Sequence, residues 1–570
     1  MFVTPYLAGR DTELNHLRQL LQPEGRTRII TLSGSSSVGK SALIIEAMHQ
    51  NKALFENGAL YLDLAGTLEL HPFLVAINHI VSSRLGMLSA PITDELATDL
   101  LDILEGASIL FVLDNVEASA AREEVLSFVV QLPPTCKVLL TSSEPNPKAD
   151  ANVIINPLSK EATWTLYQEL RVDKQVVSLS SEDVSHFTKG YPATIILLAS
   201  LDLKTFLSQL PNDKAFEPSL IVDTAYAALN APAQTLAQKI SLLPRPVSLA
   251  LVSSGTWGDW QPLPARNQLQ TYRLVECNAL KCRMSSLVAQ QIVNHISVET
   301  KIDLYQQLAA AYLDTIADAL FEQEEVNWYV LDDQYPNMAA VLDRCYQAGA
   351  WQVVLNLSRS LNTYLQRVGW VAESLLRNQQ GLESSRKLQN RQAESVFLYN
   401  LGMVLHDQGR LDESETCYRD SLVLCRALGD HSAIAQSLQQ LGRLHLENED
   451  WQQAEDFLNE SLSIWLSIND DLGQGQTYYL LGMLAQRQQD FTRAMAWYRK
   501  SLAIAKRSND RYTAAQTLNN RGWIYDYQGQ YDKAINDWGG AERLFREIGS
   551  PLANDVKKQI AHLRESTNGV

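Results

Sequence analysis

Residues 31–43 read TLSGSSSVGKSAL, and within them Gly34 to Ser41 match the pattern G-x-x-x-x-G-K-[ST]. The residues just before, 28–32, are short, apolar and β-branched, which predicts a buried strand, and residues 41–48 have the pattern of a helix. A strand, a glycine-bounded loop and a helix in this order are typical of a loop that binds phosphate. The alternative is a chance match on a turn rich in glycine and serine, and the flanking elements argue against it.

The chemistry of this loop assigns roles to its residues. Backbone N–H groups wrap the β-phosphate, glycine lets the backbone come close, and the positive end of the helix dipole points at the same place. We expect Lys40 to reach the β- and γ-phosphates and the Ser41 hydroxyl to bind magnesium. The expected nucleotide contacts in the loop are Gly34, Ser35, Ser36, Ser37, Val38, Gly39, Lys40 and Ser41.

A second metal ligand is expected at the end of a neighbouring strand. Residues 108–114 read SILFVLD, which predicts a buried parallel strand with Asp114 at its carboxyl end, as in the Walker B motif. Asp114 is expected to hold magnesium together with Ser41. The next residue, Asn115, carries an amide that cannot act as a base, so Glu117 is the candidate for that catalytic role.

A third strand is predicted from residue 137, and its carboxyl end should also face the nucleotide. Thr141 and Ser142 are therefore candidates to sense the γ-phosphate. The predicted strands alternate with helical segments, which favours an α/β domain with a doubly wound parallel sheet.

Composition limits the classes of function. The 570 residues carry 48 Lys and Arg against 65 Asp and Glu, a net charge of −17, which argues against a general nucleic-acid or anionic-membrane surface. Six scattered cysteines, with no C-x-x-C pair and no secretory signal, are expected to be reduced; Cys277 and Cys282 are the closest pair. The longest apolar run is far shorter than the ~20 residues of a membrane span. We therefore expect a soluble cytoplasmic protein.

From residue 351 onward the sequence repeats with a period of 40 residues. Small and large residues recur in register, and among the small ones glycine stands at residues 402, 442, 482 and 522. The large residues that align with Tyr418 are expected to lie in the core, filling the gap between units. The pattern resembles tetratricopeptide repeats with lengthened helices, which implies an all-α superhelix with a concave face and a capping helix near residues 551–566.

The concave face of such a stack is a candidate surface for a protein or peptide ligand. The first helix of each unit would line it, with amide and aromatic side chains exposed. The expected partner-binding residues are Asn400, Gln440, Arg443, Tyr479, Asn520 and Trp523.

The order of motifs in the first 300 residues resembles the NB-ARC (AP-ATPase) branch of the STAND nucleotide-switch proteins, in its bacterial form. The matching segments are Gly9-Arg10 with Glu13-Leu14, the two motifs above, residues 141–145 (TSSEP) and residues 190–193 (GYPA). The resemblance implies that the Arg10 segment packs near an adenine, that Pro192 touches it, and that residues 215–295 form a winged-helix domain. The cofactor it implies is ATP or ADP with Mg²⁺.

Two positions depart from the family pattern. Ser143 stands where the bacterial family usually has an arginine that senses the γ-phosphate, and Ser285 stands where a histidine usually touches the ADP β-phosphate. These departures weaken the case for ATP hydrolysis and for a tightly held ADP state. At most, we expect a slow ATPase.

The predicted organisation is a P-loop domain over 1–150, a helical domain over 151–212, a winged helix over 213–299, a helical linker over 300–350, five repeats over 351–550 and a tail over 551–570. The favoured function is a nucleotide-dependent signalling switch in regulation or defence that senses a partner through its repeats. No length is left for an effector domain, so its output is expected to be oligomerisation or recruitment of an effector on a separate chain. The alternatives are a repeat scaffold with a structural, non-hydrolysed nucleotide and, less favoured, a DNA-binding transcriptional regulator.

Overall fold

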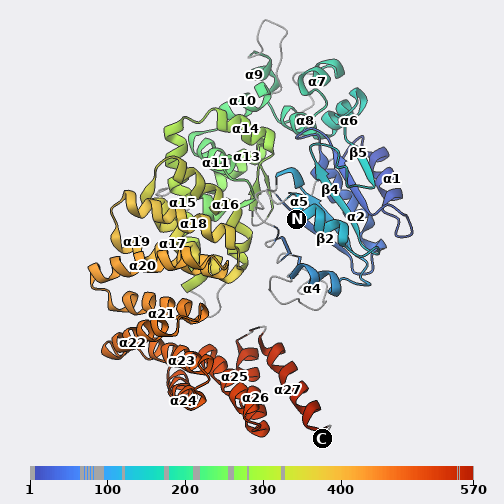
Figure 1. Cartoon of the computed structure of the whole chain (residues 1–570). Helices are drawn as coiled ribbons and strands as arrows, with labels where there is room; N and C mark the ends of the chain where they lie inside the picture. Colours follow the sequence, from blue (N-terminus) through green and yellow to red (C-terminus); the bar gives the residue numbers. More distant parts are fainter. Residues whose placement is uncertain are drawn as a thin grey trace. The chain divides into compact units, whose positions relative to one another are not determined.

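The computed structural model of the chain describes residues 7–64, 70, 73–74, 77–78, 81, 96–118, 122–171, 179–208, 219–253, 262–278, 281–321, 328–548, 550 and 552–568. The chain divides into two units, Met1–Trp370 and Val371–Val570. The first unit contains the sheet, and the second consists of helices (Figure 1).

A five-stranded parallel sheet organises the first unit. Its strands are β1 (Ile29–Ser33), β2 (Ala59–Asp63), β3 (Leu110–Asp114), β4 (Lys137–Ser142) and β5 (Ala151–Ile154), in the order β2-β3-β4-β1-β5. Every residue of β1, β3 and β4 is buried, whereas the edge strands β2 and β5 are partly exposed. The predicted α/β fold is confirmed, and the two edge strands, whose apolar pattern is weaker, are additions to the prediction.

Helices cover both faces of this sheet (Figure 1). α1 (Asp11–Leu20) and α2 (Lys40–Asn51) pack against Leu110 and Val112, while α4 (Leu96–Ile103) and α5 (Arg122–Gln131) pack against Phe111 and Leu113. Neighbouring residues of one strand thus enter opposite cores, because side chains alternate across a strand. A strand buried on both faces reads as a continuous apolar run, which explains why β3 could be predicted from sequence.

The remainder of the first unit is mostly helical. The elements that follow the sheet are α6 (Lys160–Leu170), α7 (Ser181–Thr188), α8 (Pro192–Leu198), α9 (Leu203–Ser208), α10 (Ser219–Ala227), α11 (Ala231–Ser241), α12 (Leu249–Ser253), α13 (Pro262–Thr271), α14 (Ser286–Asn294), α15 (Val298–Phe321), α16 (Trp328–Gln347) and α17 (Trp351–Val368). A small antiparallel sheet lies among them, with β6 (Val247–Ser248), β8 (Lys281–Arg283) and β7 (Glu276–Cys277) side by side. One apolar core runs from Leu158 to Trp370 and joins these elements.

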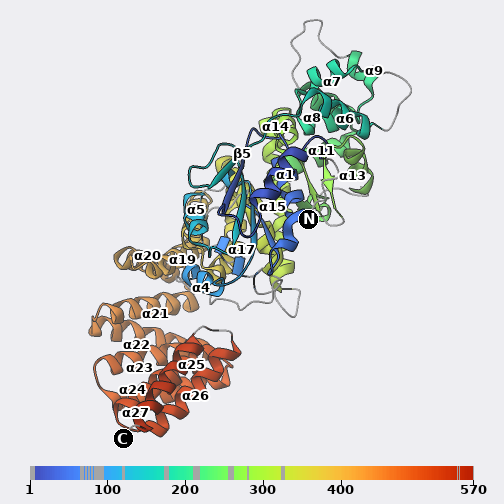
Figure 2. The same ribbon diagram turned by 90° about the vertical axis from the view of Figure 1, so that its right-hand side faces the viewer.

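The second unit is a stack of antiparallel helix pairs, which Figures 1 and 2 show in chain order. Its helices are α18 (Val371–Lys387), α19 (Arg391–Asp407), α20 (Leu411–Leu428), α21 (His431–Glu447), α22 (Trp451–Ser467), α23 (Asp471–Arg487), α24 (Phe491–Arg507), α25 (Arg511–Tyr527), α26 (Tyr531–Glu547) and α27 (Leu552–Asn568). The predicted all-α superhelix of tetratricopeptide type is confirmed.

Glycine allows the two helices of each pair to approach closely. A Cβ added at Gly402 would lie 2.6 Å from the Tyr418 ring, and one at Gly482 would lie 2.4 Å from the Tyr498 ring. Both rings are buried, as expected for core positions. Tyr418 packs on Gly402 of its own unit and also shares a core with Leu438 of the next, so it fills space within a unit as well as between units.

Serine joins the helices at a second repeated position. Ser421, Ser461 and Ser501 each donate from Oγ to a backbone carbonyl 26 residues earlier, at 2.8–2.9 Å. Each hydroxyl is buried, so this bond satisfies a donor that would otherwise be costly. The small residue at this position therefore has a structural role that the repeat pattern alone did not indicate.

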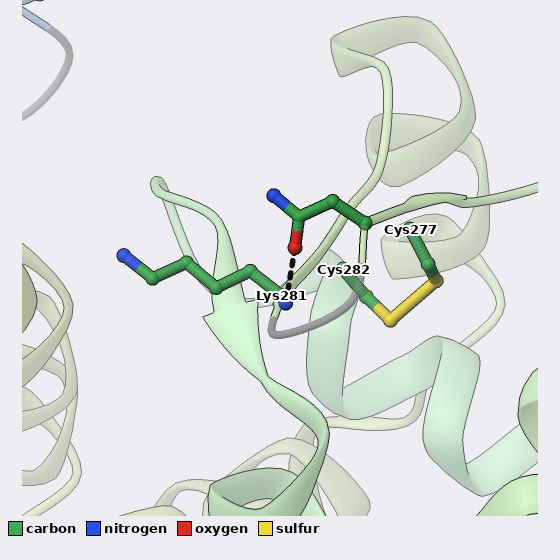
Figure 3. Close-up of a disulfide and its surroundings, with 4 residues drawn as sticks. Cys277, Lys281 and Cys282 are labelled. Carbon is green, nitrogen blue, oxygen red and sulfur yellow. Dashed lines mark hydrogen bonds between the residues drawn. A yellow bond between two sulfur atoms is a disulfide. The ribbon is translucent and has the colours of Figure 1, made fainter. Parts of the chain in front are cut away.

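The expectation that all six cysteines are reduced is wrong for one pair. Cys277 and Cys282 form a disulfide (Figure 3). They face each other across the β7–β8 ladder with Cα atoms 4.2 Å apart, so strand register brings the sulfur atoms together. Cys136, Cys345, Cys417 and Cys425 are free.

Among the described helices, none combines the length and the apolar character that crossing a bilayer requires.

Candidate functional site

The loop between β1 and α2 has the backbone that phosphate binding needs. Gly34 has φ +155° and Gly39 φ +101°, and a Cβ at Gly34 would lie 2.4 Å from the Ile155 carbonyl oxygen. Ser37 also takes a left-handed conformation, with φ 63°. A glycine-bounded curve of this kind turns successive N–H groups toward one point, which is the property that makes such loops bind anions.

Lys40 and Ser41 open helix α2 at the end of this loop. Lys40 Nζ donates to the carbonyl oxygens of Gly34 at 2.6 Å and Ser35 at 3.1 Å, so its ammonium already lies over the loop. Burial lowers the pKa of Lys40, while the charges of Glu117 and Asp114 oppose that shift. Lysine, serine and loop thus come together as the sequence predicted.

The carboxylate of Asp114 lies at the carboxyl end of β3, and its two oxygens are held by three hydroxyls. Ser41 Oγ donates to Oδ1 at 3.1 Å, Thr141 Oγ1 donates to Oδ1 at 2.6 Å, and Tyr61 OH donates to Oδ2 at 3.0 Å. Strand β4 lies between β1 and β3, so Thr141 at its end stands between the other two predicted ligands. Ser41 and Asp114 form the oxygen-rich pair expected of a magnesium site.

Tyr61 is a site residue that the sequence analysis missed. It lies in edge strand β2, two residues before Asp63, so both side chains point to the same face. Burial and the Asp114 carboxylate raise the pKa of Tyr61 far above its usual value, so its hydroxyl remains a donor to Asp114. The signal that could have found it is the run Ala59–Asp63, an apolar strand that also ends in an acid.

Asn115 and Glu117 follow Asp114 and differ in what they contact. Asn115 takes φ 58°, donates from its side chain to Asp63 Oδ1 at 2.8 Å, and donates from its backbone to Thr141 Oγ1 at 2.8 Å. Glu117 Oε2 is buried and has no hydrogen-bond partner among the described residues. Burial raises the pKa of Glu117, and Lys40 opposes that shift. Asn115 is therefore engaged in structure, whereas Glu117 has an oxygen available.

The expected adenine contacts lie beside the loop. Arg10 is buried and donates from Nη2 to the carbonyl oxygens of Val38 at 2.9 Å and Asn156 at 2.8 Å, so it holds the loop in place. Pro192 begins helix α8, and its Cγ would lie 3.6 Å from a Cβ at Gly39. Both residues thus adjoin the phosphate loop, Arg10 through hydrogen bonds from its guanidinium to backbone carbonyls and Pro192 through its position beside Gly39.

The region predicted to be a winged helix contacts the loop through a serine at the start of helix α14. Ser286 Oγ lies 2.7 Å from Ser36 Oγ, 250 residues earlier in the chain. Ser285 is the exposed residue before helix α14 and makes no side-chain cap. The role that the resemblance implies for position 285 at the ADP β-phosphate stays a prediction, and the contact with the loop is made by the next residue, Ser286.

Polar atoms around the loop remain available for a bound group. Ser37 Oγ, like Glu117 Oε2, is buried and unpartnered among the described residues. Together with the Lys40 ammonium and the backbone N–H groups of the glycine-bounded loop, these atoms form the donor and acceptor set that a nucleotide phosphate and its metal require. The residues present therefore fit a magnesium nucleotide.

Five of the six expected partner-binding residues are at least partly exposed. Arg443 and Trp523 are exposed, and Trp523 retains 48% of its surface. Gln440 donates to the Tyr399 hydroxyl at 3.3 Å, and Asn520 donates to the Tyr479 hydroxyl at 3.2 Å, the same bond two repeats later. The expected exposure of the sixth residue, Asn400, is wrong, because that residue is only 7% exposed.

Comparisons with known proteins agree with this architecture. The model of an AAA ATPase domain matches residues 6–141, and that of the tetratricopeptide repeat matches residues 394–467 and 473–537. A crystal structure of a signal transduction ATPase with numerous domains (STAND) and a tetratricopeptide repeat sensor, from Pyrococcus horikoshii, matches with TM-score 0.73 and 15% identity over 99% of this chain and 81% of that one. At this identity the likeness shows the fold.

Other solved structures match only in part. The apo form of RapI matches with TM-score 0.33 and 14% identity, over 46% of this chain and 99% of that one. A Walker-type ATPase of Pyrococcus abyssi matches with TM-score 0.27 and 12% identity, over 50% of this chain and 96% of that one. Neither score indicates a shared overall fold, and no curated protein matches the sequence.

Placement in the NB-ARC branch stays a prediction that rests on the motifs. The chain joins an AAA ATPase domain to tetratricopeptide repeats in the fold of a STAND protein, which confirms the resemblance to that class.

Proposed function

We propose that the protein is a nucleotide-dependent switch that binds Mg-ATP or Mg-ADP and changes its state of assembly when a partner engages the repeats. Lys40 and the backbone of residues 34–39 would hold the phosphates, and Ser41 and Asp114 would hold the metal. When bound, the magnesium nucleotide supplies the charged phosphate chain whose length distinguishes ATP from ADP. The tetratricopeptide repeats supply a surface of the kind that generally binds proteins.

One observation carries this proposal: the phosphate loop and the winged-helix region touch through Ser36 and Ser286. A group bound on the loop would compete for, or reorient, the hydroxyl that contacts Ser286. A ligand shifts an equilibrium between two conformations only by its differential affinity for them. A contact between the phosphate loop and a second domain would give the nucleotide different affinities for the conformations with and without that contact. A purely structural nucleotide would not need such a difference.

Turnover is proposed to be slow. Asn115 is occupied by Asp63 and lacks a basic group, and Ser143 offers no cation to the γ-phosphate. A positioned cation at such a site is worth several kcal/mol in the transition state of phosphoryl transfer. Glu117, whose buried Oε2 has no hydrogen-bond partner in the described part of the chain, is the residue proposed to orient the attacking water.

A second candidate function is a repeat scaffold in which the nucleotide is structural. It is favoured by the two serines at positions where the resemblance implies an arginine and a histidine, Ser143 and Ser285. The two candidates differ in one measurable respect: only the switch changes its assembly between ADP and ATP. A partner or effector on a separate chain fits either candidate.

The test compares nucleotide binding and assembly in the full chain. Calorimetry would measure the affinity for Mg-ADP and for a non-hydrolysable ATP analogue, and sedimentation would measure mass under each. Lys40→Ala removes the ammonium over the loop, so we expect binding of both nucleotides to be lost.

Lys137→Ala is the matched control. Lys137 is also a buried lysine that donates to backbone carbonyls, those of Leu20 at 3.1 Å and Gly25 at 3.4 Å, but it begins β4 at the opposite end of the strand from Thr141. We expect its nucleotide affinity to match the wild type. Equal affinity in Lys40→Ala and wild type would refute the site, and equal mass under both nucleotides would favour the scaffold.

A further inference from the structure

Arg245 reaches from the winged-helix region to the edge of the sheet that carries the candidate nucleotide site. It lies between α11 and β6, and its Nη2 donates to the Asp63 carbonyl oxygen at 2.9 Å. Asp63 is the last residue of β2 and is paired with Asp114 in the β2–β3 register. A guanidinium from a segment 182 residues away is thus fixed beside the strand end that holds the metal ligand.

Only one residue separates this contact from Asp114. Asn115 Nδ2 donates to Asp63 Oδ1 at 2.8 Å, and the Asn115 backbone N–H donates to Asp114 Oδ1 at 3.1 Å. Asn115 is in the left-handed region, with φ 58°, a conformation that asparagine adopts more readily than other non-glycine residues, and these hydrogen bonds hold it there. Asn115 therefore links the Asp114 carboxylate by hydrogen bonds to Asp63, the residue that Arg245 contacts.

The backbone of Arg245 is held from the other side by helix α16. Its N–H donates to Asn337 Oδ1 at 2.9 Å, and its carbonyl accepts from Asn337 Nδ2 at 3.3 Å. Gln334, one turn earlier on the same helix, donates to the Pro246 carbonyl at 3.3 Å. Asn337 is fully buried and Gln334 nearly so, which makes these bonds costly to leave unmade.

Helix α16 in turn packs on α17, the last helix of the first unit. Tyr364 of α17 donates to Asp332 Oδ1 at 2.8 Å, and its ring lies 5.5 Å from that of Tyr335. Buried amides and aromatic rings of this kind have few alternative arrangements. We therefore expect α17 to move together with α16 when α16 shifts. The chain from Asp114 to α17 is therefore continuous in hydrogen bonds and packing.

We infer that Arg245 is a positioning residue that couples the nucleotide site to helix α16. The inference deepens the proposed switch and rests on it, since it names the residue through which the state of the site reaches the helices before the repeats. Arg245 acts through Asp63 and Asn115 on Asp114, and through Asn337 on α16. The simpler alternative is that Arg245 makes a constant structural contact between two domains, which would stabilise α16 equally whether or not nucleotide is bound.

The two alternatives differ in hydrogen exchange of the α16 amides, measured in the full chain without nucleotide and with saturating Mg-ADP or a non-hydrolysable Mg-ATP analogue. In the wild type we expect nucleotide to change exchange at α16 by at least about fivefold, the lower end of typical coupling between sites. In Arg245→Met, which keeps the alkyl stem and loses the donors, we expect this ratio to fall close to one.

Arg273→Met is the matched control. Arg273 is also a half-buried arginine of the winged-helix region, and its Nη2 donates to the Leu170 carbonyl at 3.1 Å, away from the phosphate loop. We expect it to retain the wild-type ratio. Arg245→Gln provides a second test if Arg245→Met folds poorly, because it keeps a polar side chain that is too short to reach Asp63.

Calorimetry on the same samples separates the outcomes. A wild type that binds neither nucleotide overturns the proposed function and this inference with it. A wild type that binds nucleotide without a change at α16 overturns the inference alone. The inference also fails if both Arg245 variants raise the exchange rate of the α16 amides by the same factor with and without nucleotide. A constant structural contact would behave in that way.

Discussion

Gly482→Ala should destabilise the repeat stack although alanine is the better helix former. Gly482 lies in α23 and faces the ring of Tyr498 in α24, where an added Cβ would lie 2.4 Å from Cε1 and 2.5 Å from Cδ1. The ring is fully buried, and its hydroxyl donates to Gln486 Oε1 at 2.7 Å. It cannot withdraw to an ordinary contact distance without moving that hydroxyl.

The expected cost follows from three terms. Overpacking a well-packed core costs about 1–3 kcal/mol, and a weakened hydrogen bond adds about 1 kcal/mol. Replacing glycine by alanine inside a helix returns about 1 kcal/mol. The net loss is therefore about 2 kcal/mol. It should raise the equilibrium population of the locally open state, and with it the hydrogen-exchange rate, roughly 30-fold, since each 1.4 kcal/mol is tenfold.

Native-state hydrogen exchange of the α23 and α24 amides in the full chain would measure this loss, because it reports local opening without requiring a two-state transition. Gly539→Ala is the control: Gly539 lies within α26, and an added Cβ there meets nothing within 4 Å. It should slow exchange in α26 by up to about fivefold, from about 1 kcal/mol of helix propensity. Unchanged or slower exchange in Gly482→Ala would refute the packing argument.

Three further predictions concern single groups. Glu117→Gln should bind nucleotide like the wild type and lower any ATP turnover by about 10²–10⁴-fold, the usual contribution of a positioned base, and unchanged phosphate release would exclude Glu117 from that role. Asp407 and Glu447 raise the pKa of His406 to about 9, and Glu447 is the closer at 2.8 Å against 3.9 Å. This raised pKa gives stability that is complete below pH ~6.5 and is lost as pH rises through ~9, so the unfolding free energy of the wild type relative to His406→Gln, measured in urea, should fall over this range by about 3 kcal/mol; a difference that stays constant with pH would contradict it. Thiol titration of denatured, unreduced protein should find four thiols of six, and Cys282→Ser should cost about 2 kcal/mol for so short a loop; six titrating thiols would contradict the disulfide.

The sequence by itself determined the features that depend on neighbouring residues. Gly34, Gly39, Lys40 and Ser41 lie in one loop, and the apolar run ending in Asp114 is a strand buried on both faces, so local pattern was sufficient for both. The repeats could also be predicted from the sequence, because each unit packs on its neighbours and the same packing positions recur every 40 residues.

Edge strands and individual exposures were harder to predict. Strand β2 is half-buried, so its pattern is weak, and the Tyr61 hydroxyl on Asp114 was missed with it. Asn400 was expected on the surface from its helix, and is buried because the neighbouring helices cover it. The repeat period gives the position of a residue along a helix, but its exposure depends on how the next helices are inclined.

Only the tertiary structure decided which distant segments meet at the site. Ser286 touches Ser36 across 250 residues, and Arg245 touches Asp63 across 182. The register of β7 and β8 likewise decided that Cys277 faces Cys282. None of these contacts leaves a local signal, because each arises from the packing of whole domains: chain separation carries no information about which surfaces will be brought together when their apolar faces are buried.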